Sequence, residues 1–255
     1  MDSIQTKRIL KKKKKILGIV NHIFSLDETI IKFSGDRNDL TFKFIELAFE
    51  DALSGITSLN QNILEMEGLS GRKFRILLNS LVRRINSPKY LEIGSWLGST
   101  VCSACYENNI EAICIDNWSQ NFLPEINPKD IFHKNIEKFV SSKIKLKIIE
   151  ENFRNVDFKS LGISNIFFYD GGHHYEDHFD SIKMVLPALS EKFILIVDDW
   201  NWLQVRKGTL DAIKKEKLNV IAKLDIRTTK DNSSTLITGQ KSDWHQGCVF
   251  FVIEK

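Results

Sequence analysis

The chain has 255 residues, of which 42% are hydrophobic and 27% are charged. These fractions exclude a disordered chain, and the absence of an apolar run of ~18 residues excludes a membrane-spanning helix. The net charge of +3 depends on residues 7–15, KRILKKKKK, which contribute 7 of the 36 basic residues. The remaining 29 basic residues face 33 acidic ones, so the rest of the chain carries −4 and gives no compositional sign of nucleic-acid binding.

The basic tract at residues 7–15 has more than one interpretation. It could bind anionic lipid at ~1 kcal/mol per residue near a membrane surface, or act as a localisation or nucleic-acid patch. It could equally be a solvated end of the chain. Because the N-terminus lacks the pattern of a signal peptide, we expect a cytoplasmic protein with, at most, peripheral membrane contact through this tract.

Four cysteines are present, and we expect them to be reduced and packed in the interior. Cys102 and Cys105 have C-x-x-C spacing, but no second pair or histidine set completes a zinc site. Cys114 and Cys248 stand alone in the sequence.

Residues 1–65 are predicted to form a basic tail and a helical cap. Apolar residues recur at helical spacing in residues 40–56, LTFKFIELAFEDALSGI. A second helix is predicted in residues 70–85, SGRKFRILLNSLVRRI, and Pro88 disfavours its continuation. We therefore expect a helical N-terminal extension followed by a main domain over residues 66–255.

Short apolar runs then alternate with helical segments, a pattern typical of a parallel sheet covered on both faces. The last two runs are joined by a polar stretch and are expected to form an antiparallel pair at one edge. The predicted fold is α/β, Rossmann-like and doubly wound, with a mostly parallel seven-stranded sheet. The predicted strands are residues 90–94, 111–116, 145–150, 165–170, 193–199, 218–225 and 247–254.

Ligands bind such sheets outside the carboxyl ends of the strands. The first predicted strand continues into a turn with Glu92, Gly94 and Gly98, where glycines let the backbone approach a ligand closely. Trp96 stands where a dinucleotide fingerprint has its second glycine, which argues for a ligand without a pyrophosphate. With the neighbouring Ser95, these residues are candidate cofactor contacts, and a tight turn without a ligand is the alternative.

The second strand supplies a candidate for binding a ribose. Asp116 lies 22 residues after Gly94, the distance at which an acid typically reaches ribose hydroxyls, although it could instead cap a helix. Asn117 is included with it as a cofactor contact, and Trp118 could stack on an adenine or pack in the protein. Asn152, after the third strand, is a candidate for the edge of the base.

Three carboxylates end the fourth and fifth strands, and they are expected to crowd one rim of the sheet. At an effective dielectric near 20, two carboxylates ~4 Å apart repel by about 4 kcal/mol. Asp170, Asp198 and Asp199 would therefore suit Mg²⁺, Mn²⁺ or Ca²⁺. In the alternative, Asp198 or Asp199 caps a helix and only one of the two faces the site.

Three histidines follow Asp170 in the segment FFYDGGHHYEDHFD. His173 is the candidate general base, because an imidazole with a pKa near neutrality can take a proton from a hydroxyl. His174 could pack or support the metal. His178 is expected to start a helix and to face solvent.

The motifs YLEIGSWLGST, CIDNW, FFYDGGHHYED and FILIVDDW, in this order, resemble class I S-adenosylmethionine-dependent methyltransferases. They are most similar to the metal-dependent, macrocin-O-methyltransferase-like sugar O-methyltransferases, over about residues 66–255. Trp96 departs from the glycine of most class I enzymes. The resemblance implies a methionine-binding loop at Glu92, Gly94 and Gly98, a ribose-binding Asp116, metal ligands Asp170, Asp198 and Asp199, and a base at His173.

The sequence thus predicts an O-methyltransferase that uses S-adenosylmethionine and Mg²⁺ or Mn²⁺. Its acceptor would be a hydroxyl of a small molecule or glycan, with a sugar implied by the resemblance. One rival hypothesis is a metal-dependent hydrolase or oxygenase on the same rim. Another is a non-catalytic methyltransferase-like domain tethered by its basic tail. Nucleic acid is not an expected partner, and the sequence leaves open whether the chain forms a homo-oligomer.

Overall fold

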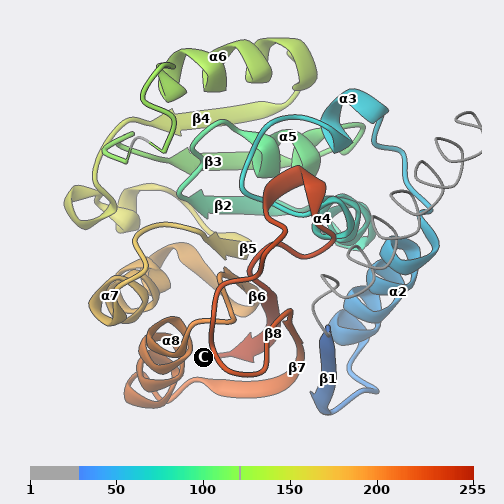
Figure 1. The fold of residues 1–255 in the computed structure, drawn as a ribbon. Helices are drawn as coiled ribbons and strands as arrows, with labels where there is room; N and C mark the ends of the chain where they lie inside the picture. The colour runs from blue at the N-terminus through green and yellow to red at the C-terminus, as the bar shows by residue number, and fades with distance from the viewer. Residues whose placement is uncertain (1–28, 121) are drawn as a thin grey trace, which may run out of the picture.

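The computed structural model describes residues 29–120 and 122–255. These residues contain a mixed sheet of eight strands (Figure 1). The strand order is β1-β7-β8-β6-β5-β2-β3-β4. The basic tract at residues 7–15 lies outside the described residues. The strands are β1 (Ile30–Gly35), β2 (Lys89–Ile93), β3 (Glu111–Ile115), β4 (Lys145–Ile149), β5 (Ser164–Tyr169), β6 (Leu189–Asp198), β7 (Asn219–Arg227) and β8 (Cys248–Glu254).

Helices cover both faces of this sheet. Alternate residues of each strand point to opposite faces, and both sets are apolar in the central strands, so each face needs cover from water. On β5, Phe168 packs in a core beneath α2, α4, α5 and α6, whereas Phe167 packs in a second core beneath α7 and α8. The helices are α2 (Leu40–Ser54), α3 (Gln61–Leu64), α4 (Arg72–Arg84), α5 (Ser99–Cys105), α6 (Pro128–Phe139), α7 (Tyr175–Val185) and α8 (Leu203–Lys215).

The predicted doubly wound sheet is confirmed, with one strand more than expected. β4, β3, β2, β5 and β6 are parallel neighbours, and β8 is antiparallel to both β6 and β7. The unpredicted strand β1 pairs antiparallel with β7, from Ile30 opposite Arg227 to Gly35 opposite Ala222. The β7–β8 pair is therefore not the edge of the sheet. β1 was missed because six residues with only two core-facing side chains, Ile31 and Phe33, carry little periodic signal.

The N-terminal helix is less amphipathic than its sequence suggested. Asp39 caps α2 by accepting from the Phe42 amide, and Gly55 ends the helix in the left-handed conformation. Leu40, Leu47 and Leu53, which belong to the apolar residues at helical spacing in this segment, are exposed instead.

The buried residues of α2 pack on the same core as the sheet: Phe42, Ile45, Ala48, Phe49 and Ala52. The predicted division of the chain at residue 65 stays a prediction. All four cysteines are free and buried, as expected. None of the helices in the described residues combines the length and apolar character needed to cross a bilayer.

Candidate active site

A cavity of about 240 Å³ opens at the carboxyl ends of β2, β3, β4 and β5. This is where parallel strands of a doubly wound sheet place their ligands. The cavity contains most of the predicted site. Of the predicted cofactor residues, Gly94, Ser95, Asp116, Asn117 and Asn152 line it, whereas Glu92, Gly98 and Trp118 do not.

The glycine turn after β2 is required by the close approach of neighbouring backbone. Gly94 has φ +90°, and a Cβ at this position would lie 1.9 Å from the carbonyl oxygen of Asp170. Any larger residue would therefore separate the ends of β2 and β5. Trp96 also has a positive φ, 39°, so the tryptophan adopts a backbone conformation that glycine more readily takes. The turn thus keeps the shape of a glycine-rich loop without the second glycine.

Asp116 holds this turn in place through its carboxylate. One oxygen accepts from the amides of Ser95 at 2.7 Å and Trp96 at 2.8 Å, and the other accepts from the amide of Trp118 at 2.6 Å. The residue caps a loop rather than a helix. Because an ionised carboxylate has about four lone-pair positions, Asp116 can still accept a further hydrogen bond from the cavity side.

Trp118, a predicted cofactor contact, has a packing role instead. Its indole N–H donates to the carbonyl of Trp96 at 2.9 Å, and its ring meets Phe132 edge-on at 5.3 Å. The aromatic wall of the cavity is formed by Trp96 and Phe122, whose rings lie 5.4 Å apart in an edge-to-face arrangement. Phe122 was missed because an isolated aromatic in a long loop has no periodic signal.

Asn152 occupies the turn after β4, where its side-chain oxygen accepts from the amide of Arg154. Arg154 also lines the cavity and bridges to α7 through ion pairs with Asp177 at 3.0 Å and Asp180 at 2.9 Å. These contacts fix the position of the loop that carries Asn152. The role of Asn152 at a base edge stays a prediction.

Glu92 lies behind the cavity wall and is fully buried. Its carboxylate accepts from the hydroxyl of Tyr90 and from the hydroxyl of Thr100 at 2.9 Å, and Thr100 lines the cavity. Burial raises the pKa of Glu92 to about 7. Glu92 therefore supports the start of α5 through Thr100 and does not itself reach the cavity.

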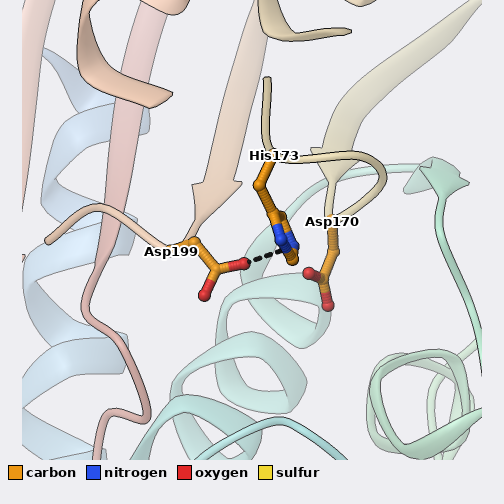
Figure 2. A group of neighbouring side chains, drawn as sticks. All are labelled: Asp170, His173 and Asp199. Carbon is orange, nitrogen blue, oxygen red and sulfur yellow. Dashed lines mark ion pairs between the residues drawn. The ribbon is translucent and has the colours of Figure 1, made fainter. Parts of the chain in front are cut away.

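Asp170, His173 and Asp199 converge at the rim, from the end of β5, the turn that follows it and the end of β6 (Figure 2). One ligand atom from each residue lies within 4.8 Å of the other two. His173 Nε2 pairs with Asp199 Oδ2 at 2.9 Å, and the His173 ring meets Trp202 edge-on at 4.8 Å. Asp199 itself has a left-handed backbone, φ 55°.

Burial and neighbouring charges shift the pKa values of the groups at this rim. Burial, together with the charges of Asp198 and Asp199, raises the pKa of Asp170 well above its usual range. Burial acts to raise the pKa of Asp199 as well, but the hydrogen bond and charge of His173 outweigh it and hold that pKa low. Conversely, burial acts to lower the pKa of His173, and its hydrogen bond to Asp199 outweighs this and raises it. The hydrogen bond between His173 and Asp199 thus shifts the pKa values of both groups in opposite directions.

Asp198 lies outside this group, which corrects the predicted set of three aspartates. As the last residue of β6 it pairs with Cys248 of β8, and successive side chains diverge at a strand end. Its carboxylate is buried, and Oδ2 has no hydrogen-bond partner among the described residues. Burial and the charge of Asp199 raise the pKa of Asp198 well above its usual range. His173, predicted as the base, joins Asp170 and Asp199 in the group.

The other two histidines of the segment have structural positions. His174 is the N-cap of α7, and its amide donates to Asp177 Oδ2 at 3.1 Å. The prediction that His178 faces solvent is wrong, because α7 packs on α8 so closely that a Cβ on Gly208 would lie 3.0 Å from the Cβ of His178. His178 is 2% exposed, contacts Tyr169, and has its pKa lowered by burial to about 3.

A further histidine, His245, was not predicted. It is buried in the loop between β7 and β8, with Nε2 3.9 Å from Asp199 Oδ1. Its neighbours SDWHQG match no short motif, so only the folded chain brings it to the rim.

Residues 91–200 match the sequence model of a family described as a methyltransferase domain. No curated protein matches the chain significantly. The O-methyltransferase TomG from Streptomyces achromogenes, involved in tomaymycin synthesis and crystallised with SAM, superposes with a TM-score of 0.54 at 10% identity, over 85% of this chain and 99% of its own. The O-methyltransferase from Bacillus cereus, crystallised with SAH, gives a TM-score of 0.53 at 11% identity, over 84% and 100%.

At these identities the structural likeness shows the fold. The chain spans about half the length, 48%, of TrmN from Thermus thermophilus, which superposes with a TM-score of 0.48 at 11% identity over 71% of this chain. The matched family segment runs from β2 to just beyond β6 and includes the glycine turn, Asp116, Asp170 and His173. Residues 91–200 thus match a methyltransferase domain, and the chain has the Rossmann-like fold of the O-methyltransferases that superpose on it.

Proposed function

We propose that the protein is an S-adenosylmethionine-dependent O-methyltransferase in which His173 is the general base. The observation that carries the proposal is the 2.9 Å pair of His173 and Asp199 beside Asp170, at the rim of the strand-end cavity. The methyltransferase-domain match supports methyl transfer over hydrolysis or oxygenation. The SAM and SAH complexes of TomG and the Bacillus cereus enzyme support this cofactor.

The cavity residues fit S-adenosylmethionine. Asp116 has lone-pair capacity left for a ribose hydroxyl. Trp96 and Phe122 offer aromatic surface to an adenine. The turn after Gly94 lets the backbone approach the ligand and lacks the glycine that a pyrophosphate would need. The cofactor supplies a methyl group already activated by its bond to a sulfonium sulfur.

The rim residues also fit a divalent cation, held by Asp170 and Asp199 with the carboxyl group of Asp198 nearby. Asp199 Oδ1 and Asp198 Oδ2 are buried without hydrogen-bond partners among the described residues, and carboxylate oxygens left without partners suit Mg²⁺ or Mn²⁺. The cation would lower the pKa of an acceptor hydroxyl.

His173 is positioned to take the proton from that hydroxyl. Asp199 orients the imidazole and raises its pKa, which makes His173 a stronger base. His173 lines the cavity, and a hydroxyl oxygen among the atoms of the group would lie within hydrogen-bond reach of the imidazole. Removal of this proton and alignment of the oxygen with the methyl carbon are the tasks left to the protein.

The proposed acceptor is a hydroxyl of a small molecule or glycan, with sugars as the first class to test. Nucleic acid is not proposed, because the chain outside residues 7–15 carries −4. The basic tract at residues 7–15 is proposed as a peripheral contact with anionic membranes. Co-sedimentation with vesicles containing phosphatidylserine, before and after deletion of the tract, tests that contact separately from catalysis.

The experiment combines cofactor binding with methyl transfer. Calorimetry with S-adenosylhomocysteine is followed by transfer of labelled methyl groups to a panel of sugars and phenols, with Mg²⁺ or with EDTA. Asp170→Asn should bind S-adenosylhomocysteine normally and lose at least about 100-fold in transfer rate. Asp211→Asn, an exposed carboxylate on α8 that accepts from Tyr175, is the matched control and should leave both unchanged.

Two outcomes would contradict the proposal. If the wild-type chain does not bind S-adenosylhomocysteine, the cofactor assignment is wrong. Full transfer activity in EDTA would remove the cation from the mechanism while leaving His173 as base, and His173→Asn then tests the base on its own.

A further inference from the structure

We propose that His245 is a positioning residue that holds Asp199, through its Nε2–H group, in the orientation needed to bind a divalent cation. The inference rests on the proposed function. His245 comes from a loop far from the motifs that indicated the site, and it lies beyond the matched family segment.

The hydrogen bonds of the ring determine where its proton lies. His245 Nδ1 accepts from the amide of Gly239 at 2.9 Å. A nitrogen that accepts a hydrogen bond carries no proton, so the ring is neutral and its proton is on Nε2. Nε2 is therefore a donor and cannot be a metal ligand while this bond lasts. His245 belongs to the support of the site and not to its ligand set.

The donor faces an oxygen that needs one. Asp199 Oδ1 is buried and has no hydrogen-bond partner among the described residues, whereas Oδ2 is paired with His173 at 2.9 Å. His245 Nε2 lies 3.9 Å from Oδ1. This separation is about 1 Å longer than a hydrogen bond, and a small rotation of the carboxylate would close it. His173 and His245 would then hold the two oxygens of Asp199 from opposite sides.

The backbone fixes this juxtaposition. The pairing of β6 with β8 continues past the strand ends, because Trp200 N donates to Gly247 O at 3.1 Å and Asn201 N donates to Gln246 O at 2.8 Å. These bonds hold residues 246 and 247 against the chain just after β6, and His245, the adjacent residue of the loop, is thereby kept near Asp199. Within the loop, the His245 amide donates to the hydroxyl of Ser242 at 2.9 Å, so the backbone of His245 is held as well as its ring.

Hydrogen-bond partners of ligating carboxylates typically change metal affinity by about 10- to 100-fold when removed. Two variants separate the two hydrogen bonds of the ring. His245→Asn places an amide oxygen where Nδ1 was, so it keeps the acceptor for Gly239 and loses the donor to Asp199. His245→Gln places an amide nitrogen near the position of Nε2, so it keeps the donor.

The test is Mn²⁺ binding to the full chain, measured by calorimetry, with S-adenosylhomocysteine binding as the control for folding. We expect His245→Asn to weaken Mn²⁺ binding by about 10- to 100-fold and His245→Gln to stay within about threefold of wild type. Both should bind S-adenosylhomocysteine normally. Nitrogen-15 NMR of the wild-type protein should show His245 as the Nε2–H tautomer, which requires no variant to fold.

Three results would overturn the role of His245: unchanged Mn²⁺ affinity in His245→Asn, equal losses in both variants, or an Nδ1–H tautomer. If the wild-type protein binds S-adenosylhomocysteine but not Mn²⁺, the cation site of the proposed function fails, and the role of His245 fails with it. Normal Mn²⁺ binding by wild type with no effect of the variants refutes His245 alone.

Discussion

Replacing Glu92 with glutamine should make the stability of this protein less dependent on pH and should stabilise it in alkaline solution. Glu92 is fully buried between Tyr90 and Thr100, and burial raises its pKa from 4.5 to about 7. Above pH 7 the folded protein must therefore keep an ionised carboxylate in its interior.

The magnitude follows from the difference between the two pKa values. Because Glu92 binds its proton more tightly in the folded state than in the unfolded state, the stabilisation from this proton is fully present below pH 4.5. It is lost as the pH rises through about 7. The difference between 4.5 and about 7 corresponds to roughly 3 kcal/mol, most of which falls between pH 5 and 9. Glutamine has no such loss. Its carbonyl can still accept from Thr100, and its amide can donate to the oxygen of Tyr90.

The assay is urea unfolding of wild type and Glu92→Gln from pH 5 to 9, at constant ionic strength and without added cations. Between these limits the free energy of unfolding of wild type should fall by 2–3 kcal/mol more than that of the variant. Glu111→Gln is the matched control, because ion pairs with Lys145 and Lys89 keep the pKa of the exposed Glu111 low, outside this range. Parallel curves for wild type and Glu92→Gln would refute the assignment of a raised pKa to Glu92.

Three further changes have expected outcomes. Between pH 7 and 5, His178 should lower the free energy of unfolding of the wild type by roughly 2 kcal/mol, because its folded pKa near 3 lies below the unfolded value of 6.5 and acid therefore favours unfolding. His178→Leu should not show this fall in urea unfolding. Equal acid sensitivity in both proteins would contradict this. Trp96→Ala should weaken S-adenosylhomocysteine binding at least about tenfold in calorimetry, whereas Trp118→Phe should change it less than about threefold. A larger loss of affinity in Trp118→Phe than in Trp96→Ala would indicate that Trp118 is the stacking residue. Gly94→Ala should lower the melting temperature by more than about 10 °C, because its Cβ would collide with the backbone of Asp170, and an unchanged melting temperature would contradict that geometry.

The sheet and its strand-end carboxylates could be predicted because their signals are local. A run such as NIFFYD is apolar on both faces, ends in a polar residue and precedes a helical segment. Parallel strands place such ends at one edge, which is enough to bring Asp170 and Asp199 together. The same argument could not separate Asp198 from Asp199, since neighbouring residues differ only in the direction that the strand gives each side chain.

The errors arose where tertiary packing decides. His178 lies on a helix whose polar residues suggested solvent, and only the close approach of α8 at Gly208 buries it. Trp118 could stack or pack by its sequence, and its hydrogen bond to the Trp96 carbonyl turns it from the cavity. Glu92 was correctly placed at a strand end, but the hydroxyl of Thr100 stands between it and the cavity.

The position of His245 follows from the topology of the sheet. β8 inserts antiparallel between β6 and β7, so the loop that precedes it must pass the carboxyl end of β6. Register pairs Asp198 with Cys248, and the loop just before Cys248 brings the side chain of His245 to 3.9 Å from Asp199. The matched family segment ends at residue 200, yet Asp199 meets a partner 45 residues beyond that limit. The proposed catalytic unit therefore includes the antiparallel strands, because a chain cut after β6 would retain the carboxylates and lose the donor that orients one of them.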